Sequence, residues 1–541
     1  MKNLLFSLAI LSLFASCKPS MLDDQALLAY ADSADPELIK QHIAILAHDS
    51  LRGRLPGTAE YEVAMKYVMD QYQSIGIRPL GDKEGNSYLQ AMTFRKSIVD
   101  ESSSYLLLNG KDSMEVGEDY FFLGNAQEAE TVFGGELVIA GYGIDAPQFG
   151  HNDFENLDVK EKIVVVFSGG PEALPATERA HFSNTNTKVE TLIEKGALGI
   201  LFTTFPGGRG NFKGSYNRNS KSGMVNVKMP NGDYQGRSNF GNMKFGGFLD
   251  WEFIRKIMED ETDSFLTKYE QGVLIQPEND VYLNGKVVTN FSEFESANVV
   301  GILEGGELKD EYVIHTAHLD HVGVGEPING DSIYNGAHDN ASGVSAMLEI
   351  ARLYSELPSK PKRSVIFAAV TAEEMGLLGS LYLANNPVVP AENIIANVNT
   401  DMPTMVGPLV SVEPLGAEQS SIMNIVERTT GLLNLIIDED HLPEEVRFVR
   451  SDNYSFVKAG IPALRMKFGI QSKDSPSGLD SAITYVMGQM YHKPSDELDD
   501  SFNFEGAKTY VELQFMNSYL INTSEERPTW NENSFFKRFV R

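Results

Sequence analysis

Apolar, strand-like runs alternate with amphipathic, helix-like segments from about residue 298 to the C-terminal end of the chain. The expected strands are 298–303, 312–315, 364–370, 394–399, 409–412 and 463–468. The expected helices are 343–354, 420–429, 455–459 and 504–521. This alternation indicates an α/β fold with a mixed, mostly parallel central sheet flanked by helices. Ligands of such sheets bind at the carboxyl ends of the strands, so residues that follow the strands are the first candidates for a site.

The chain before residue 298 has a different character. Its patterns predict amphipathic helices at 35–55 and 61–75, and short β-rich runs at 136–140, 162–167 and 199–203. Residues 206–247 are rich in Gly, Asn and Ser and hold seven Lys or Arg against one Asp, which predicts a long basic surface loop. Two interpretations of that loop remain: it covers a cleft and attracts acidic peptides, or it is merely solvated.

Composition excludes several classes of protein. The chain has 541 residues, which suggests two to four domains, and a formal net charge of −30. Because a surface with this much negative charge repels the phosphates of nucleic acids, we expect no nucleic-acid partner. The single cysteine excludes a disulfide framework, a cysteine-based zinc site and an iron–sulfur cluster. A metal site in this chain would therefore use His, Asp and Glu.

The N-terminal residues have the pattern of an export signal. Lys2 precedes an apolar run over 4–14, which is too short to span a bilayer but suits a signal peptide. The run ends in Ala15-Ser16-Cys17, which resembles a bacterial lipoprotein signal; the alternative is an ordinary secretory signal with an incidental cysteine. We therefore predict a signal peptide over 1–17 and lipidation at Cys17. The exported protein would be anchored to a bacterial membrane by lipid alone, facing the periplasm or the outside of the cell.

Clusters of histidines and carboxylates follow several of the expected strands. They are His315 and His318-Leu319-Asp320-His321, His338-Asp339, Glu373-Glu374, Thr400-Asp401 and Tyr491-His492. Taken singly, each has a plainer interpretation, such as an interior histidine or a solvated helix start. Together they provide the nitrogen and oxygen donors that two neighbouring divalent ions need, with one carboxylate able to bridge them. Such donors suit zinc, with manganese or cobalt as alternatives.

The order of these motifs resembles the M28 family of co-catalytic zinc peptidases, most of which are aminopeptidases. The motifs are His-x-Asp, Gly-Ala-x-Asp-Asn-Ala-Ser-Gly, Glu-Glu-x-Gly, Asp-Met and Tyr-His, and the resemblance covers about 38–132 and 295–530. Residues 152–166 and 195–199 resemble a protease-associated (PA) domain, which is often inserted in this family. The resemblance implies a zinc exopeptidase fold in two segments, 25–132 and 290–541, with a β-rich PA domain inserted over 133–285.

The resemblance also implies roles for individual residues. Asp339 would bridge two zinc ions; the remaining ligands would be Glu374 and His492 for one ion, and His318 and Asp401 for the other. Glu373 would be the general base, and Tyr491 would stabilise the oxyanion.

Some positions are less certain in role or depart from the family pattern. Asp320 is expected to fix the tautomer of His318. Arg450 either holds a substrate carbonyl or carboxylate, or forms a surface salt bridge. Asn453 stands where the family usually has His. His338 stands where Asp is common, and it either tunes the site or faces away. The remaining two nearby histidines are expected to be structural or solvated, namely His315 and His321.

The function predicted on these grounds is a di-zinc aminopeptidase that acts on peptides. One alternative is a glutamate-releasing carboxypeptidase, which needs several arginines at the cleft, whereas only Arg450 is an evident candidate. A non-catalytic, receptor-like relative would lose metal ligands, and none is lost here. A glutaminyl cyclase uses one zinc and normally lacks a PA insert. The sequence gives no indication of oligomeric state.

Overall fold

The structure is a computed structural model that describes residues 21–82, 84–205, 210–258, 267–269, 273–472 and 478–540. The predicted signal peptide at 1–17 and its Cys17 lie outside these residues, so both stay predictions. Within the described part of the chain, no helix has the length and apolar character needed to cross a membrane.

The main sheet has a parallel centre and antiparallel flanks. Its strands run in the order β12–β11–β2–β14–β18–β15–β19–β22–β20–β21, and the pairs between β18 and β22 are parallel. Their bounds are β2 Leu89–Val99, β11 Met224–Lys228, β12 Tyr234–Gly236, β14 Tyr282–Leu303, β15 Leu308–His318, β18 Arg363–Val370, β19 Ile394–Asn399, β20 Ser411–Leu415, β21 Ile436–Ile437 and β22 Ala463–Phe468. The predicted mixed, mostly parallel sheet flanked by helices is therefore confirmed.

Helices cover both faces of this sheet. Strand β18 is buried at every position, so its side chains face apolar layers on both sides, as expected for a central strand. The helices of the larger layer are α1 Asp24–Ala31, α2 Pro36–Leu46, α3 Ala59–Ser74, α9 Ser342–Ser355, α11 Ile422–Leu433 and α14 Phe504–Thr523. On the opposite face lie α10 Leu378–Asn385 and α12 Asn453–Lys458.

Residues 100–288 contribute most of a second lobe with its own sheet and core. The sheet order is β6–β9–β10–β13–β5, parallel except for the last pair. The bounds are β3 Tyr105–Leu108, β5 Tyr120–Leu123, β6 Glu130–Ile139, β9 Ile163–Phe167, β10 Gly199–Thr203 and β13 Phe245–Leu249, with α4 Ala176–Ser183, α5 Thr185–Glu194, α6 Phe212–Ser222 and α7 Trp251–Met258. Leu106 and Tyr120 belong to this core. The lobe therefore begins before residue 133, where the insert was predicted to start; its assignment as a PA domain stays a prediction.

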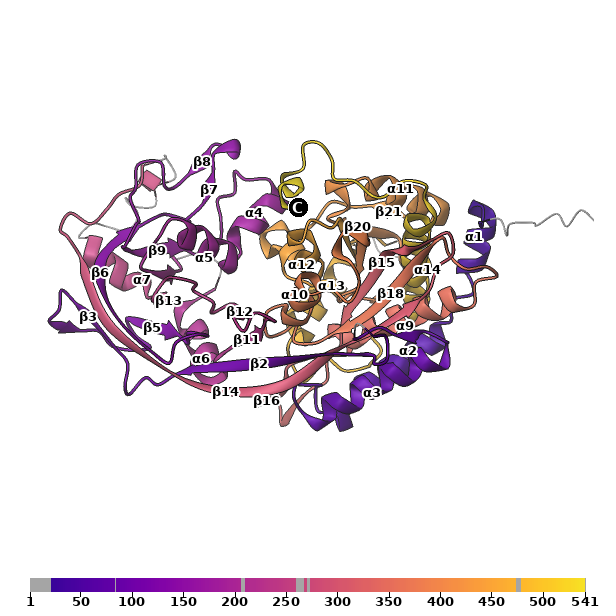
Figure 1. The fold of residues 1–541 in the computed structure, drawn as a ribbon, viewed down its shortest axis with the longest axis horizontal. Coiled ribbons are helices and arrows are strands. Elements are labelled where there is room, and N and C mark those ends of the chain that lie inside the picture. The colour runs from indigo at the N-terminus through magenta and orange to yellow at the C-terminus, as the bar shows by residue number, and fades with distance from the viewer. Residues whose placement is uncertain are drawn as a thin grey trace, which may run out of the picture.

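Two long strands join the lobes. Residues 282–288 of β14 pair with β6, residues 289–299 pair with β2, and residues 299–303 pair with β18. Figure 1 shows β2 and β14 running together along one side of the molecule from the second lobe to the main sheet. One continuous 22-residue strand thus belongs to both sheets.

Two local predictions are wrong. The expected helix over 35–55 ends at Leu46, and the chain then turns through a short 3-10 helix at Asp49–Leu51. The expected loop over 206–247 contains α6, β11, β12 and the start of β13. The Gly- and Asn-rich composition of this segment gave no local sign of these strands. They form because β11 pairs with β2 and β13 pairs with β5, strands that are distant in sequence.

Candidate metal centre

The His and carboxylate side chains meet at the carboxyl edge of the main sheet. His318 is the last residue of β15, Glu373 and Glu374 follow β18, and Asp401 follows β19. Since these three strands are parallel neighbours, their carboxyl ends lie side by side. Asp339 joins them from the turn before α9. The fold therefore gathers side chains from four separate segments at one place.

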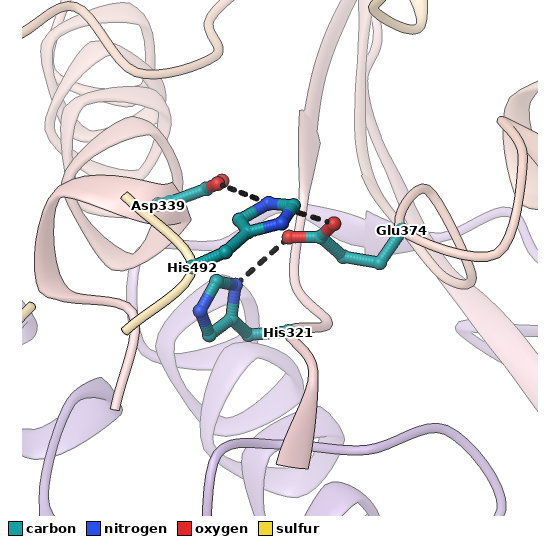
Figure 2. Close-up of side chains that lie close together, drawn as sticks. All are labelled: His321, Asp339, Glu374 and His492. Atoms are coloured by element: carbon teal, nitrogen blue, oxygen red, sulfur yellow. Dashed lines mark hydrogen bonds and ion pairs between the residues drawn. The ribbon is translucent and has the colours of Figure 1, made fainter. Parts of the chain in front are cut away.

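Asp339 lies between two groups of donors and directs one oxygen at each. His492 Nε2 is 3.2 Å from Asp339 Oδ2 and 3.0 Å from Glu374 Oε2. Figure 2 shows His492 between Asp339 and Glu374, with His321 below His492 and a dashed line from it to the Glu374 carboxylate. On the other side of Asp339, His318 Nε2 is 3.2 Å from Asp339 Oδ1 and 3.7 Å from Asp401 Oδ1.

The donor set fits a pair of divalent cations. Ligand atoms of two groups, His321–Asp339–Glu374–His492 and His318–Asp339–Asp401, lie within 4.8 Å of one another in each group. Nε2 of His492 is buried and close to two carboxylates, yet its geometry forms no hydrogen bond with any described residue. A nitrogen placed this way suits coordination to a metal, and imidazole with carboxylate is a common ligand set for zinc.

The electrostatics of the cluster also call for positive charge. Burial works against the charged forms, but the carboxylates outweigh it at His492 and raise its pKa to about 11. At Glu374, burial and Asp339 oppose ionisation, whereas His492 and His321 lower the pKa to about 2. Burial of Asp401 is likewise outweighed by Arg465, 3.0 Å away, and by His318, so its pKa lies below the usual range. The carboxylates therefore stay ionised and attract cations.

The backbone is strained where it presents these side chains. Ala372, Met402 and His492 have φ values of 55°, 43° and 53°, which non-glycine residues seldom adopt. Ala372 precedes Glu373, Met402 follows Asp401, and His492 is itself in the cluster. Strain of this kind persists only when surrounding contacts impose it, and it concentrates at functional sites.

Buried polar groups hold the loops of the cluster in place. The guanidinium of Arg54 donates to the carbonyls of Leu319 at 2.8 Å, Asn335 at 2.6 Å and Gly336 at 3.0 Å, which joins the loop after β15 to the turn before Asp339. The carboxylate of Asp496 accepts from the backbone N–H groups of His338 and Asp339. These bonds fix the backbone that carries His318 and Asp339.

The contacts of Asp320 differ from the expected ones. Its carboxylate accepts from the backbone N–H groups of Glu373 and Glu374, at 3.1 and 3.2 Å. The partner of His318 Nδ1 is instead the backbone carbonyl of Asp320, at 3.1 Å. The His318 ring is therefore oriented by the main chain, and the Asp320 side chain positions the two glutamates. Burial raises the pKa of Asp320 to about 7.

The structure separates the other histidines. His321, expected to be structural or solvated, lies in the cluster with Nδ1 2.9 Å from Glu374 Oε1. Its position three residues after His318 in the same loop was the available signal. His338 turns away and stacks on Phe502, with ring centroids 3.9 Å apart. His315 is buried and stacks on Phe367. Asn453 donates to the carbonyl of Phe448.

A cavity of about 60 Å³ opens beside the cluster and is lined by Glu373, Tyr491 and Arg450 among others. The Glu373 carboxylate forms no hydrogen bond or ion pair with a described residue, and burial raises its pKa well above the usual range. For Arg450 the sequence left two alternatives, a surface salt bridge and a position at the substrate site, and the structure shows both an ion pair and a contact at the cavity. Arg450 pairs with Glu445 at 3.0 Å, and it donates to the hydroxyl of Tyr491 at 3.2 Å at the cavity.

The sequence did not identify several basic residues that lie at the site. Arg237 follows β12 within the segment predicted as a loop, and its side chain lies against Gly376, just after the glutamate pair. Three more basic side chains line the cavity, namely Arg447, Arg465 and Lys467. The last two lie on β22, where they read as alternating strand residues, and only the fold shows that they face the cavity.

Comparisons with known proteins match the part of the chain that carries this site to a peptidase family. Residues 298–515, which contain all five predicted metal ligands, match the family described as Peptidase family M28. A "Probable zinc metalloprotease" of Pyrenophora teres f. teres (strain 0-1) is 29% identical over 222 residues, or 39% of this chain and 46% of that protein. "Aminopeptidase YwaD" of Bacillus subtilis (strain 168) is 35% identical over 120 residues, or 22% of this chain and 23% of that protein. The chain thus covers less than half the length of these two relatives.

A solved structure extends the likeness of the fold to both lobes. "Aminopeptidase from Aneurinibacillus sp. strain AM-1" superimposes with a TM-score of 0.52 over 93% of this chain and 97% of that one, at 18% identity. At this identity the match concerns the fold alone.

Proposed function

We propose that the chain is a co-catalytic di-zinc exopeptidase, an aminopeptidase that removes N-terminal residues from peptides; the match of residues 298–515 to Peptidase family M28 supports this. The observation that carries the proposal is Asp339, whose two oxygens face separate groups of ligand atoms. Relatives described as zinc metalloproteases and aminopeptidases support the metal and the reaction class.

The proposed ligands form two sets that share Asp339. One set is completed by His318 and Asp401, and the other by Glu374 and His492. Nδ1–H of His321 donates to the Glu374 carboxylate and so orients it. When bound, zinc ions supply Lewis acidity to the scissile carbonyl and lower the pKa of water.

Glu373 is the proposed general base. Its carboxylate lines the cavity beside His318 and Asp401 and is not engaged by any described residue, so it is available to a water molecule. Glu373 removes a proton from that water as the water oxygen attacks the peptide carbonyl carbon. It then transfers the same proton to the departing amine when the C–N bond breaks, which returns the carboxylate to its ionised form.

Tyr491 is the proposed oxyanion donor. Its hydroxyl accepts a hydrogen bond from Arg450, which leaves the O–H proton to point at a substrate oxygen in the cavity. Burial raises the pKa of Tyr491, so the hydroxyl keeps this proton throughout the physiological range. A donor fixed in this way stabilises negative charge that develops on the carbonyl oxygen.

Export and lipid anchoring at Cys17 remain part of the proposal. They are supported by the N-terminal sequence alone. The membrane is then a tether, and the substrate is a peptide outside the cytoplasm.

The decisive experiment is Glu373→Gln in the full chain. We expect the variant to retain two zinc equivalents by elemental analysis and to lose aminopeptidase activity by about 10²–10⁴-fold, the usual contribution of a general base. Glu392→Gln, an exposed site remote from the cavity, is the matched control. Substantial activity in Glu373→Gln contradicts the base assignment, and one zinc with cyclase activity contradicts the peptidase assignment.

A further inference from the structure

The cavity beside the metal centre has walls of opposite character. One wall is apolar and comes from Leu442, Phe468, Ile483 and Met487. The other is basic and comes from His441, Arg447 and Lys467. Since the cavity also touches His318, Glu373 and Asp401, a side chain one or two bonds from the scissile carbonyl would extend into it.

Lys467 is a buried ammonium without a carboxylate in contact. Its side chain is 6% exposed. Nζ donates to two neutral acceptors, the carbonyl of Met402 and the hydroxyl of Thr404, and forms no ion pair with a described residue. Burying a charge in this way is costly unless an anion neutralises it, and burial accordingly lowers the pKa of Lys467 to about 7.

The neighbouring charges already have partners. Arg447 binds Glu413 and Asp440, and Arg465 binds Asp401. Glu413, Asp440 and Asp401 are therefore engaged by other cations, and no carboxylate forms an ion pair with Lys467 among the residues that the structure describes.

His441 adds a second polar atom on the same wall. Its Nδ1 contacts the carboxylate of Glu413, which is fully buried, so the ring cannot turn freely. Its Nε2 is buried and lacks a hydrogen-bond partner within the described chain. Nε2 of His441 therefore remains available for a polar contact at the cavity.

We propose that this cavity binds the carboxylate of an acidic side chain through Lys467, with His441 as a second polar contact, so that the enzyme selects peptides with N-terminal Glu or Asp. The inference rests on the proposed aminopeptidase function and names its substrate class. The methylene groups of the side chain pack on Phe468 and Ile483, and the carboxylate supplies the counter-charge that Lys467 lacks. Basic side chains are repelled by the same wall.

The first test compares p-nitroanilides of Glu, Asp, Gln, Leu and Lys with the zinc-loaded full chain. Glu and Gln have the same shape and differ in charge, so their kcat/KM ratio isolates the carboxylate. A charged hydrogen bond of the usual strength predicts a Glu/Gln ratio of about tenfold or more. The Lys substrate should be the poorest of the five.

The second test is Lys467→Met, which keeps the length of the side chain and removes its charge. We expect the Glu/Gln ratio to fall towards one, because the Glu substrate loses its partner and the Gln substrate does not. Lys360→Met, at an exposed surface pair, is the matched control and should leave the ratio unchanged. Thermal unfolding of both variants checks that they fold.

The outcomes separate this inference from the function on which it rests. Cleavage of Leu or Gln substrates with a Glu/Gln ratio of one or less overturns acidic selectivity and leaves the aminopeptidase intact. A high ratio that survives in folded Lys467→Met overturns the role of Lys467. Cleavage of none of the five, with cleavage of N-blocked peptides ending in Glu, overturns the aminopeptidase and this inference together. The wild-type ratio decides the question even if Lys467→Met does not fold.

Discussion

Asp452 is a fully buried carboxylate beside the metal centre, and neither of its oxygens has a hydrogen-bond partner in the described structure. The nearby hydroxyl of Ser380 is engaged by Leu377 and Ser455. Burial raises the pKa of Asp452 to about 6. The folded state therefore resists ionisation of this residue, which costs stability at neutral pH.

We predict that Asp452→Asn stabilises the metal-stripped protein at pH 7.5. A pKa raised from 3.8 to about 6 corresponds to about 3 kcal/mol of lost stability above pH 6. This penalty disappears as the pH falls through 6 towards 3.8, so the gain from Asp452→Asn should shrink over the same range. Thermal unfolding at pH 7.5 and pH 5 measures it. Zinc should reduce the gain, because bound cations favour the charged carboxylate; an equal gain at both pH values argues against the explanation.

At the scale of elements, the clearest predictions came from strands whose ends carry chemistry. The runs at 364–370 and 394–399 match β18 and β19 closely, because buried parallel strands are continuous apolar segments. The structure then brings His318, Asp339, Glu374, Asp401 and His492 together as their order suggested. The sequence did not predict the short strands β11 and β12, because β11 is held by pairing with β2, over a hundred residues away in sequence, and β12 pairs in turn with β11. Arg237, which directly follows β12, was therefore not predicted to lie at the site either.

Arg237, the residue directly after β12, places its side chain beside the glutamate pair of the candidate metal centre. Its guanidinium forms no hydrogen bond or ion pair with the described residues, and Nε would lie 3.0 Å from a Cβ placed at Gly376. Gly376 has φ of 122°, so a side chain there is excluded both by the backbone and by Arg237. Burial lowers the pKa of Arg237, although Glu373 and Glu374 oppose that effect. An unpaired arginine beside Glu373, the proposed general base, is a natural partner for a substrate carboxylate or carbonyl.

We predict that Arg237→Ala lowers kcat/KM for dipeptides by about tenfold, as expected for the loss of one charged hydrogen bond. Aminoacyl anilides, which lack a free carboxylate, should be affected less. The thermal midpoint should change little, because the guanidinium forms no hydrogen bond or ion pair with the described residues. Arg218→Ala, on α6 of the same segment, is the matched control. Equal losses for dipeptides and anilides argue against a carboxylate contact.

At the scale of the whole molecule, the lobes are joined at two places. The first is the pair of long strands β2 and β14 (Figure 1). The second is an aromatic seam, in which α4 of the second lobe packs against α12 and the C-terminal segment.

His181 makes the seam sensitive to acid. It is buried among Phe182, Phe535 and Phe536, and Nδ1 lies 2.5 Å from the hydroxyl of Tyr454 across the seam. Burial lowers its pKa to about 3, with further lowering by Lys458 and Arg538. The folded state thus keeps His181 neutral, and the stability it provides is complete above pH 6.5 and declines as the pH falls towards 3.

We therefore predict that acidification loosens the seam before the metal-bearing sheet. By pH 5 the penalty at His181 alone is about 2 kcal/mol. Hydrogen exchange, corrected for the intrinsic pH effect, should show earlier opening of α4 at pH 5 than at pH 7.5, with β18 still protected. His181→Gln should flatten this pH dependence while weakening the seam at all pH values, because the ring packing is lost; His48→Gln, at an exposed histidine, should not. A pH dependence of α4 that survives in His181→Gln would place the acid sensitivity elsewhere.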